Sequence, residues 1–199
     1  MNGNERLIAL IDLECTCDEN DKFKKIKSTI PREEMEIIEI GCSIINEKGD
    51  LKNTFTVFVK PELHVELTDF CKNLTHISQN DVDKGITLSE ALLKLDDFLI
   101  NNNVNSWSSW GYFDKNKIIQ ETSLKKINYD ERFLSSLPHS NLSNIVKKHR
   151  GLNRKCGVGK TLNALNLEFV GDRHRAIYDT MNMARIVNKI NKDGILIKI

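Results

Sequence analysis

The first third of the chain contains short apolar runs that have the length of β-strands. They cover residues 7–17 (LIALIDLECTC), 36–45 (EIIEIGCSII) and 55–59 (FTVFV). Such runs, bounded by turn residues, predict buried strands. The turn residues between the second and third runs (NEKGDLKN) predict a hairpin. We therefore expect three consecutive antiparallel strands at the start of the fold.

The rest of the chain alternates helical patterns with short runs typical of strands. Residues 87–100 place their leucine, alanine and phenylalanine side chains on one stripe of an amphipathic helix. Residues 106–111 (SWSSWG) predict a fourth strand, which is most simply parallel to the first because a helical crossover precedes it. We also expect short helices and turns at 67–84, helices at 114–121, 141–149, 160–167 and 176–190, and a short fifth strand at 132–136. Together these elements predict an α/β fold with a mixed five-stranded central sheet flanked by helices.

Two carboxylates, Asp12 and Glu14, interrupt the first apolar run. Alternate residues of a strand point to the same face, so the two side chains project together if the strand includes them. Unpaired carboxylates repel each other and resist burial, and a divalent cation would make the arrangement favourable. The alternative is a strand that ends at Ile11, with both acids solvated in a turn. This stretch alone favours neither interpretation.

Three further polar residues are expected at the same edge of the sheet. Asp114 comes just after the fourth strand, whose carboxyl end lies beside that of the first strand if the two are parallel. His174 and Asp179 stand at the start of the last helix. Each has an ordinary explanation, because acids are favourable in the first turn of a helix and surface histidines are common. The conjunction of four carboxylates and one histidine is more specific than any single member.

The composition is that of a globular protein. The chain has 199 residues, of which 40% are hydrophobic and 29% charged, and this fits one domain over residues 1–199. Its net charge of +1 argues neither for nor against a nucleic-acid partner. The sequence shows no signal peptide or membrane-length apolar run, and its five cysteines indicate reduced thiols, so we expect a cytoplasmic location.

Two short motifs carry less information. The basic run at 22–27 (KFKKIK) follows the strand that bears the acids and suits a phosphate contact. The GVGKT stretch at 157–161 is similar to the tail of a P-loop, but the first glycine of that motif would fall at Arg154 and no strand is predicted just before it. We therefore reject a nucleoside-triphosphatase interpretation.

Four stretches together carry a resemblance to a known family: DLE at 12–14, EIIEIG at 36–41, SWGYFD at 109–114 and HRAIYD at 174–179. They resemble the DnaQ-like DEDDh 3′–5′ exonucleases, which have a ribonuclease-H-like fold. DLECTCDE, LTDFCKNLTHISQNDV and the Trp-Gly pair before Asp114 are most similar to the exoribonucleases that trim small interfering RNA and histone messenger RNA ends. The resemblance implies a single exonuclease domain that hydrolyses single-stranded 3′ ends or overhangs. It also implies that RNA is favoured over DNA and that 5′-mononucleotides are released.

The resemblance also assigns roles to the polar residues. It implies that Asp12, Glu14, Asp114 and Asp179 hold two Mg²⁺ ions, for which Mn²⁺ can substitute, in a two-metal mechanism. It makes His174 the general base on the attacking water. An imidazole suits this role because its unperturbed pKa, about 6.5, is close to working pH.

Substrate contacts are expected beside the acids. By the same resemblance, Cys15 and Thr16 offer backbone groups to the terminal sugar, where a contact with the 2′-hydroxyl would favour RNA. Leu74 is a candidate wedge against the last base. Phe70, Met35 and Trp110 either pack on bases or fill the core, and the core is favoured for Met35 and Phe70. The expected set is Cys15, Thr16, Met35, Phe70, Leu74, Trp110 and His174.

Two positions depart from the family pattern, and two other functions stay open. Tyr178 stands where many relatives have an acid, and His76 stands where a glycine is common. The first departure leaves the metal ligands intact, whereas the second could alter how the terminal nucleotide is held. The other functions are a DNA proofreading or repair exonuclease and a non-catalytic RNA-binding module. Four converging acids disfavour the module, because without a metal they cost stability.

Overall fold

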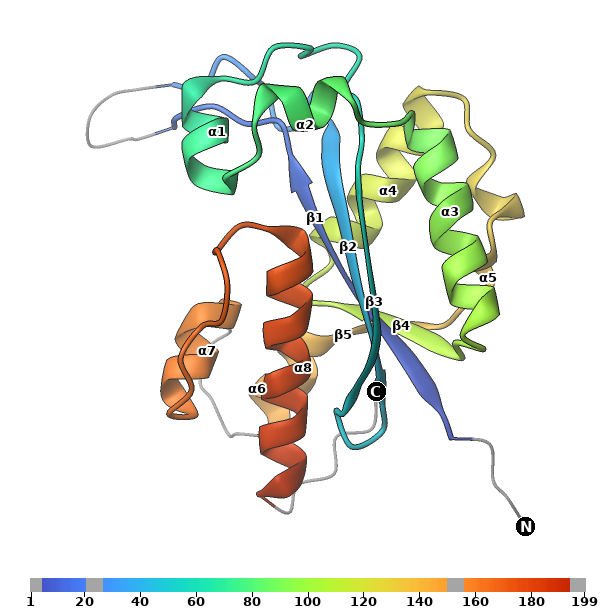
Figure 1. Cartoon of the computed structure of the whole chain (residues 1–199), viewed down its shortest axis with the longest axis vertical. Helices are drawn as coiled ribbons and strands as arrows, with labels where there is room; N and C mark the ends of the chain where they lie inside the picture. The colour runs from blue at the N-terminus through green and yellow to red at the C-terminus, as the bar shows by residue number, and fades with distance from the viewer. Residues whose placement is uncertain (1–4, 21–26, 150–155, 194–199) are drawn as a thin grey trace.

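The computed structural model describes residues 5–20, 27–149 and 156–193. Within them, five strands form one mixed sheet in the order β3-β2-β1-β4-β5 (Figure 1). The strands are β1 (Leu7–Cys15), β2 (Ile37–Asn46), β3 (Leu51–Phe58), β4 (Ser106–Ser109) and β5 (His139–Asn141). β1, β2 and β3 are successively antiparallel, whereas β4 is parallel to β1 and β5 is parallel to β4. The predicted sheet class and the direction of the fourth strand are confirmed.

The central strands are buried and the edge strand β3 is largely exposed. All ten residues of β2 are buried, which explains its nearly continuous apolar sequence. The hairpin from β2 to β3 turns at Gly49, whose φ of 84° suits glycine. The Asn46 side chain accepts backbone N–H bonds from Lys48 (3.0 Å) and Asp50 (2.8 Å), so this turn fixes the hairpin locally.

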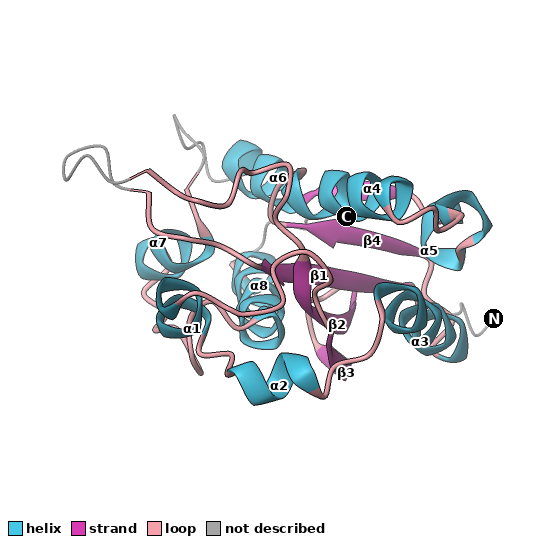
Figure 2. Cartoon of the chain, turned by 90° about the horizontal axis from the view of Figure 1, so that it is seen from above, coloured by secondary structure: helices cyan, strands magenta, loops and turns pink. Residues whose placement is uncertain are grey.

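Helices cover both faces of the sheet (Figures 1 and 2). In the described residues they are α1 (Asp69–Thr75), α2 (Gln79–Asp83), α3 (Leu88–Asn101), α4 (Phe113–Leu124), α5 (Phe133–Ser136), α6 (Leu142–His149), α7 (Val158–Ala164) and α8 (Ala176–Lys192), with a 3₁₀ turn at Tyr129–Glu131. On one face, Ile11 of β1 belongs to a core with Leu95 of α3 and Ile118 of α4. On the other face, Leu10 belongs to a core with Met183 of α8. Alternate residues of β1 therefore serve two cores.

α1 and α2 lie beyond the carboxyl end of β1 (Figure 1). Their apolar residues form a third, smaller core with Ile38 of β2. Most of the basic run at 22–27 lies outside the described residues. Among the described residues, no helix combines the length and apolar character that a membrane span requires.

The prediction of a strand at 132–136 is wrong, because these residues include the helix α5. The Ser135 hydroxyl donates to the Arg132 carbonyl (2.8 Å), and the Leu134 N–H donates to the Asp96 carboxylate (2.9 Å). These bonds favour a helical turn over an extended chain. The fifth strand is His139–Asn141, just after Pro138, and it has no apolar pattern that would reveal it.

Candidate active site

β1 continues through both carboxylates to Cys15, so the alternative of a strand that ends at Ile11 is wrong. Asp12 pairs with Gly41, and Glu14 pairs with Glu39 of β2. Both carboxylates line a cavity of about 330 Å³. The two acids are therefore held side by side near the carboxyl end of a central strand.

Gly41 lets the first turn of α8 lie directly against β2. A Cβ atom at this position would come within 2.3 Å of the Ala176 carbonyl carbon and 2.4 Å of the Ile177 nitrogen. Any larger residue would therefore push the start of α8 away from the sheet. Because that turn carries Asp179, Gly41 helps to set the distance between Asp179 and β1.

The side chain of Glu39, on β2, binds the start of α8. Its carboxylate is fully buried and accepts the Ala176 N–H (2.9 Å). It also pairs with the Arg175 guanidinium through Nε (3.2 Å) and Nη2 (3.1 Å). The N-cap residue of α8, Arg175, makes no capping bond with its side chain. Glu39, on the neighbouring strand, instead accepts one of the free N–H groups at the start of this helix. We assigned Glu39 no role from the sequence, although an acid inside a buried apolar strand was an available signal.

Asp179 meets the two acids of β1. One oxygen from each of Asp12, Glu14 and Asp179 lies within 4.8 Å of the other two. Burial, followed by repulsion from the neighbouring acids, raises the pKa of Asp12 well above its usual range and that of Glu14 to about 9. Burial also raises the pKa of Asp179 to about 6, although the His174 N–H and Arg173 oppose the shift. Three oxygen donors that resist ionisation and share one small space fit a divalent cation.

Asp114 lies in the first turn of α4 and is 6% exposed. It lines the same cavity but is not one of the three acids whose oxygens lie within 4.8 Å of one another. Burial raises its pKa to about 6, while backbone N–H groups of Asp114 and Leu13 and the Ser109 side chain oppose the shift. The expectation that the fourth strand would bring Asp114 beside the acids of β1 agrees with this placement.

His174 is exposed and lies in the loop before α8, with a φ of 59°. Its backbone N–H donates to Oδ2 of Asp179 (3.0 Å), which ties the loop to the acid. Partial burial, together with Arg173 and His76, lowers the pKa of its imidazole. The ring is therefore neutral at pH 7 and has a lone pair that can take a proton.

The five predicted catalytic residues all line this one cavity, and so does Trp110 of the predicted substrate contacts. The indole of Trp110 donates to the Cys156 carbonyl (2.8 Å), which fixes its orientation. Leu13, Gly111 and Phe113 line the cavity as well. We did not single them out from the sequence, although Phe113 directly precedes Asp114 in the SWGYFD motif.

The other predicted substrate contacts lie outside this lining. The Thr16 N–H donates to the Glu36 carbonyl (2.8 Å), and its Oγ1 accepts the Glu36 N–H (2.8 Å). The Cys15 carbonyl accepts a bond from the Cys71 thiol (3.6 Å). These bonds fasten the end of β1, so the Thr16 N–H is already in use. The set also includes three half-buried residues, Met35, Phe70 and Leu74. The contacts of all these residues with substrate stay predictions.

Comparisons with known proteins show the family to which the chain belongs. Residues 9–187 match the family model RNase_T, described as Exonuclease. The human protein 3′–5′ exoribonuclease 1 is 26% identical over an alignment of 204 positions that covers 96% of this chain and 54% of that protein. The 3′–5′ exonuclease eri1 of Schizosaccharomyces pombe is 26% identical over an alignment of 215 positions that covers 96% of this chain and 69% of that protein. The chain spans about half the length of the human relative.

The fold is also shared with solved exonucleases. One such structure shows 3′-end specific recognition of a histone mRNA stem-loop by a 3′-exonuclease. It superposes on this chain with a TM-score of 0.82 at 25% identity. The match covers 100% of this chain and 87% of that one. Since the family model extends over most of the sequence, the chain belongs to the exonuclease family that the model defines, with a ribonuclease-H-like fold.

Proposed function

We propose that this chain is a metal-dependent 3′–5′ exonuclease that hydrolyses single-stranded 3′ ends, prefers RNA to DNA and releases 5′-mononucleotides. One observation carries the proposal: all five residues of the expected set line one cavity, namely Asp12, Glu14, Asp114, His174 and Asp179. The names of the human and fission-yeast relatives support the direction of cleavage, and the human name supports RNA as substrate.

The acids of the cavity are suited to divalent cations. Asp12, Glu14 and Asp179 would hold one ion, and Asp114 would serve a second ion together with Asp12. Carboxylate oxygens are ligands that Mg²⁺ and Mn²⁺ prefer. When bound, such ions neutralise charge on the phosphate and make water easier to deprotonate. The raised pKa values support this fit, because a cation offsets the repulsion that otherwise keeps these acids protonated.

His174 would take the proton from the attacking water while the phosphodiester bond breaks. Its neutral imidazole can accept that proton, and its exposed position lets the proton pass on to solvent. The bond from its N–H to Asp179 keeps the loop beside the acids. Trp110 and Phe113 add aromatic surface to the cavity, on which an unpaired terminal base could stack.

The proposal is tested with a short 5′-labelled oligoribonucleotide incubated with the chain and Mg²⁺. We expect a ladder that shortens from the 3′ end, release of 5′-mononucleotides, and no reaction with EDTA. Glu14→Gln should abolish the ladder, whereas Glu47→Gln, at an exposed glutamate after β2, should keep it. RNA binding without shortening would favour the non-catalytic module. Faster shortening of the matched deoxyribo-oligomer would favour a DNA exonuclease.

A further inference from the structure

A groove of about 420 Å³ lies at the opposite end of α4 from Asp114. Three segments line this groove, called the acidic groove below: residues 33–36 before β2, residues 62–63 after β3, and the stretch of α4 and its cap from Gln120 to Lys125. None of its lining residues lines the cavity of the proposed active site. The acidic groove is therefore a separate surface, and an inference about it does not depend on the proposed function.

The acidic groove gathers unusually exposed apolar side chains. Leu63 is 68% exposed and Leu124 is 65% exposed, the two highest values among the large hydrophobic residues of the described chain. They come from different segments and line the same groove, together with half-buried Met35. A single exposed leucine is ordinary, but two that meet in one groove are typical of an interaction site.

The charge around these leucines is mainly negative. Five of the ten lining residues are glutamates, and Lys125 is the one cation among them. Lys125 is already shared by the carboxylates of Glu36 (3.1 Å), Glu62 (3.0 Å) and Glu121 (3.2 Å). The two remaining glutamates, at positions 33 and 34, are exposed on the rim, where Oε2 of Glu34 lies 3.7 Å from Nε2 of His64. The rim therefore attracts a cation and repels the phosphates of a nucleic acid.

The walls of the acidic groove are joined by hydrogen bonds to the buried carboxylate of Glu36. The Glu36 carboxylate accepts backbone N–H bonds from Glu62 (2.8 Å), Leu63 (2.7 Å) and His64 (2.8 Å). Since Glu36 also pairs with Lys125, the segment after β3, the start of β2 and the end of α4 are joined at one point. A wall that is ordered beforehand lowers the entropy cost of binding.

We propose that the acidic groove binds a segment of a partner protein in which a lysine or arginine lies next to an apolar side chain. The apolar side chain would pack against Leu63 and Leu124, and the cation would lie near Glu33 and Glu34. Complementary charge selects such a segment over an acidic one, and the desolvated leucines supply most of its affinity.

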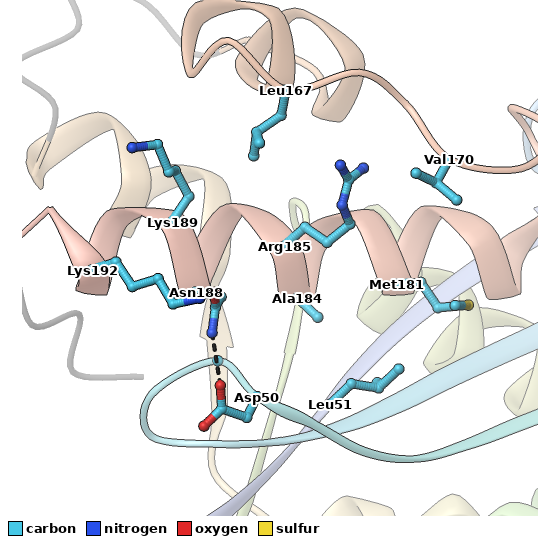
Figure 3. A pocket seen from close by; sticks show the side chains of 11 residues that line it. Asp50, Leu51, Leu167, Val170, Met181, Ala184, Arg185, Asn188, Lys189 and Lys192 are labelled. Atoms are coloured by element: carbon cyan, nitrogen blue, oxygen red, sulfur yellow. Dashed lines mark hydrogen bonds between the residues drawn. The ribbon is translucent and has the colours of Figure 1, made fainter.

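A second groove, beside α8, differs from the acidic groove in its charge (Figure 3). It has about 510 Å³ and is lined partly by exposed Leu51 and by residues of α8. Its charged lining residues are one acid, Asp50, and three cations, Arg185, Lys189 and Lys192. Asn188 donates to Asp50 (2.8 Å), and Lys189 pairs with Asp193 (2.6 Å). This groove is therefore mainly positive and does not attract a basic segment. It supplies a control, because Leu51 and Val170 are 44% and 50% exposed there.

The probe is a short fluorescein-labelled peptide in which arginine and leucine alternate, titrated with the full chain and followed by fluorescence anisotropy. Two counterparts carry glutamate for arginine or serine for leucine. We expect only the first peptide to bind well. Leu63→Ser with Leu124→Ser, and Glu33→Gln with Glu34→Gln, should each weaken binding at least about tenfold. Leu51→Ser with Val170→Ser should keep the affinity within about twofold.

Several results would overturn the proposal. One is no binding, and another is equal binding of the glutamate peptide or of the groove variants. A loss of affinity in Asp12→Asn would place the peptide in the active-site cavity instead. Self-association that vanishes in Leu63→Ser with Leu124→Ser would make a second copy of the chain the occupant. RNA cleavage, assayed in parallel, reports on the proposed function alone, because the groove variants should keep it.

Discussion

Acids that are buried or half-buried in this molecule occur in two opposite electrostatic settings. In the cavity, Asp12, Glu14 and Asp179 converge on each other, and burial with mutual repulsion raises the pKa of Glu14 to about 9. Just before β2, Glu36 is only 2% exposed, yet backbone N–H bonds and Lys125 outweigh burial and lower its pKa. An acid whose charge is balanced by fixed partners is therefore structural, whereas acids that converge with too few donors to balance them form a site for a ligand.

The sharpest test of this contrast is Asp12→Asn, which removes one of the opposed charges and keeps the shape. We expect turnover to fall at least about 10³-fold, because several kcal/mol of charge stabilisation depend on the metal. In EDTA the free energy of unfolding should rise, since the folded state no longer holds a carboxyl group with a raised pKa at this position. Cleavage of the labelled oligoribonucleotide measures turnover, calorimetric titration measures Mg²⁺ binding, and urea unfolding measures stability. Normal metal binding with normal turnover would refute the site.

His174→Ala separates proton transfer from metal binding within the same cavity. We expect turnover to fall about 10²–10⁴-fold, the usual scale for a general base. The Mg²⁺ titration should stay as in the wild type, because the bond to Asp179 comes from the backbone N–H of residue 174. Single-turnover cleavage of the labelled oligoribonucleotide measures the chemical step. Unchanged cleavage would mean that another group accepts the proton.

Glu39→Gln tests the other setting, where the acid has partners. The variant loses the ion pair with Arg175 in a fully buried position, and we expect the free energy of unfolding to fall by roughly 2–3 kcal/mol. Turnover should fall as well, because Glu39 holds the turn that carries Asp179. Glu47→Gln, at an exposed site, should change stability by less than about 0.5 kcal/mol. Equal urea midpoints for the two variants would show that Glu39 is not a structural partner.

The sequence allows part of the fold to be predicted, and the reason is burial. β1 and β2 are recognisable because burial of their residues leaves nearly continuous apolar runs. β5 is not recognisable, because His-Ser-Asn has no apolar pattern and its strand conformation depends on pairing with β4. The bond from the Trp107 N–H to the Pro138 carbonyl (3.0 Å) connects residues 31 positions apart in the chain, and local propensity cannot show it.

The candidate site divides in the same way. Asp12 and Glu14 could be predicted because a carboxylate in an apolar strand is itself the chemical signal. Glu39 has that feature too, yet its partner Arg175 lies on a distant segment, so its structural role appears only in the fold. Phe113 is ambiguous for a similar reason, since an aromatic residue suits a core and a binding cavity equally well.

The last expected effect is a pH dependence of stability that reverses when metal is added. The pKa values of Asp114 and Asp179 are about 6 in the folded chain, and an unfolded aspartate has a pKa of about 3.9. The folded state therefore binds more protons than the unfolded state between these values, so in EDTA stability should fall as pH rises through about 4 to 6. Glu14, with a pKa of about 9, extends the decline to higher pH. A pKa difference of one is worth about 1.4 kcal/mol, so the two aspartates together should cost several kcal/mol of stability across this window.

Mg²⁺ should oppose that decline, because it binds the ionised acids and stabilises the folded state by mass action. With excess Mg²⁺ the stability should therefore rise with pH where in EDTA it falls, and urea unfolding at several pH values under both conditions measures the difference. Asp12→Asn should show nearly the same curve with and without Mg²⁺. If the wild-type curves coincide as well, the four acids of the cavity do not form a metal site, and the contrast with Glu36 and Glu39 would have to be explained by burial alone.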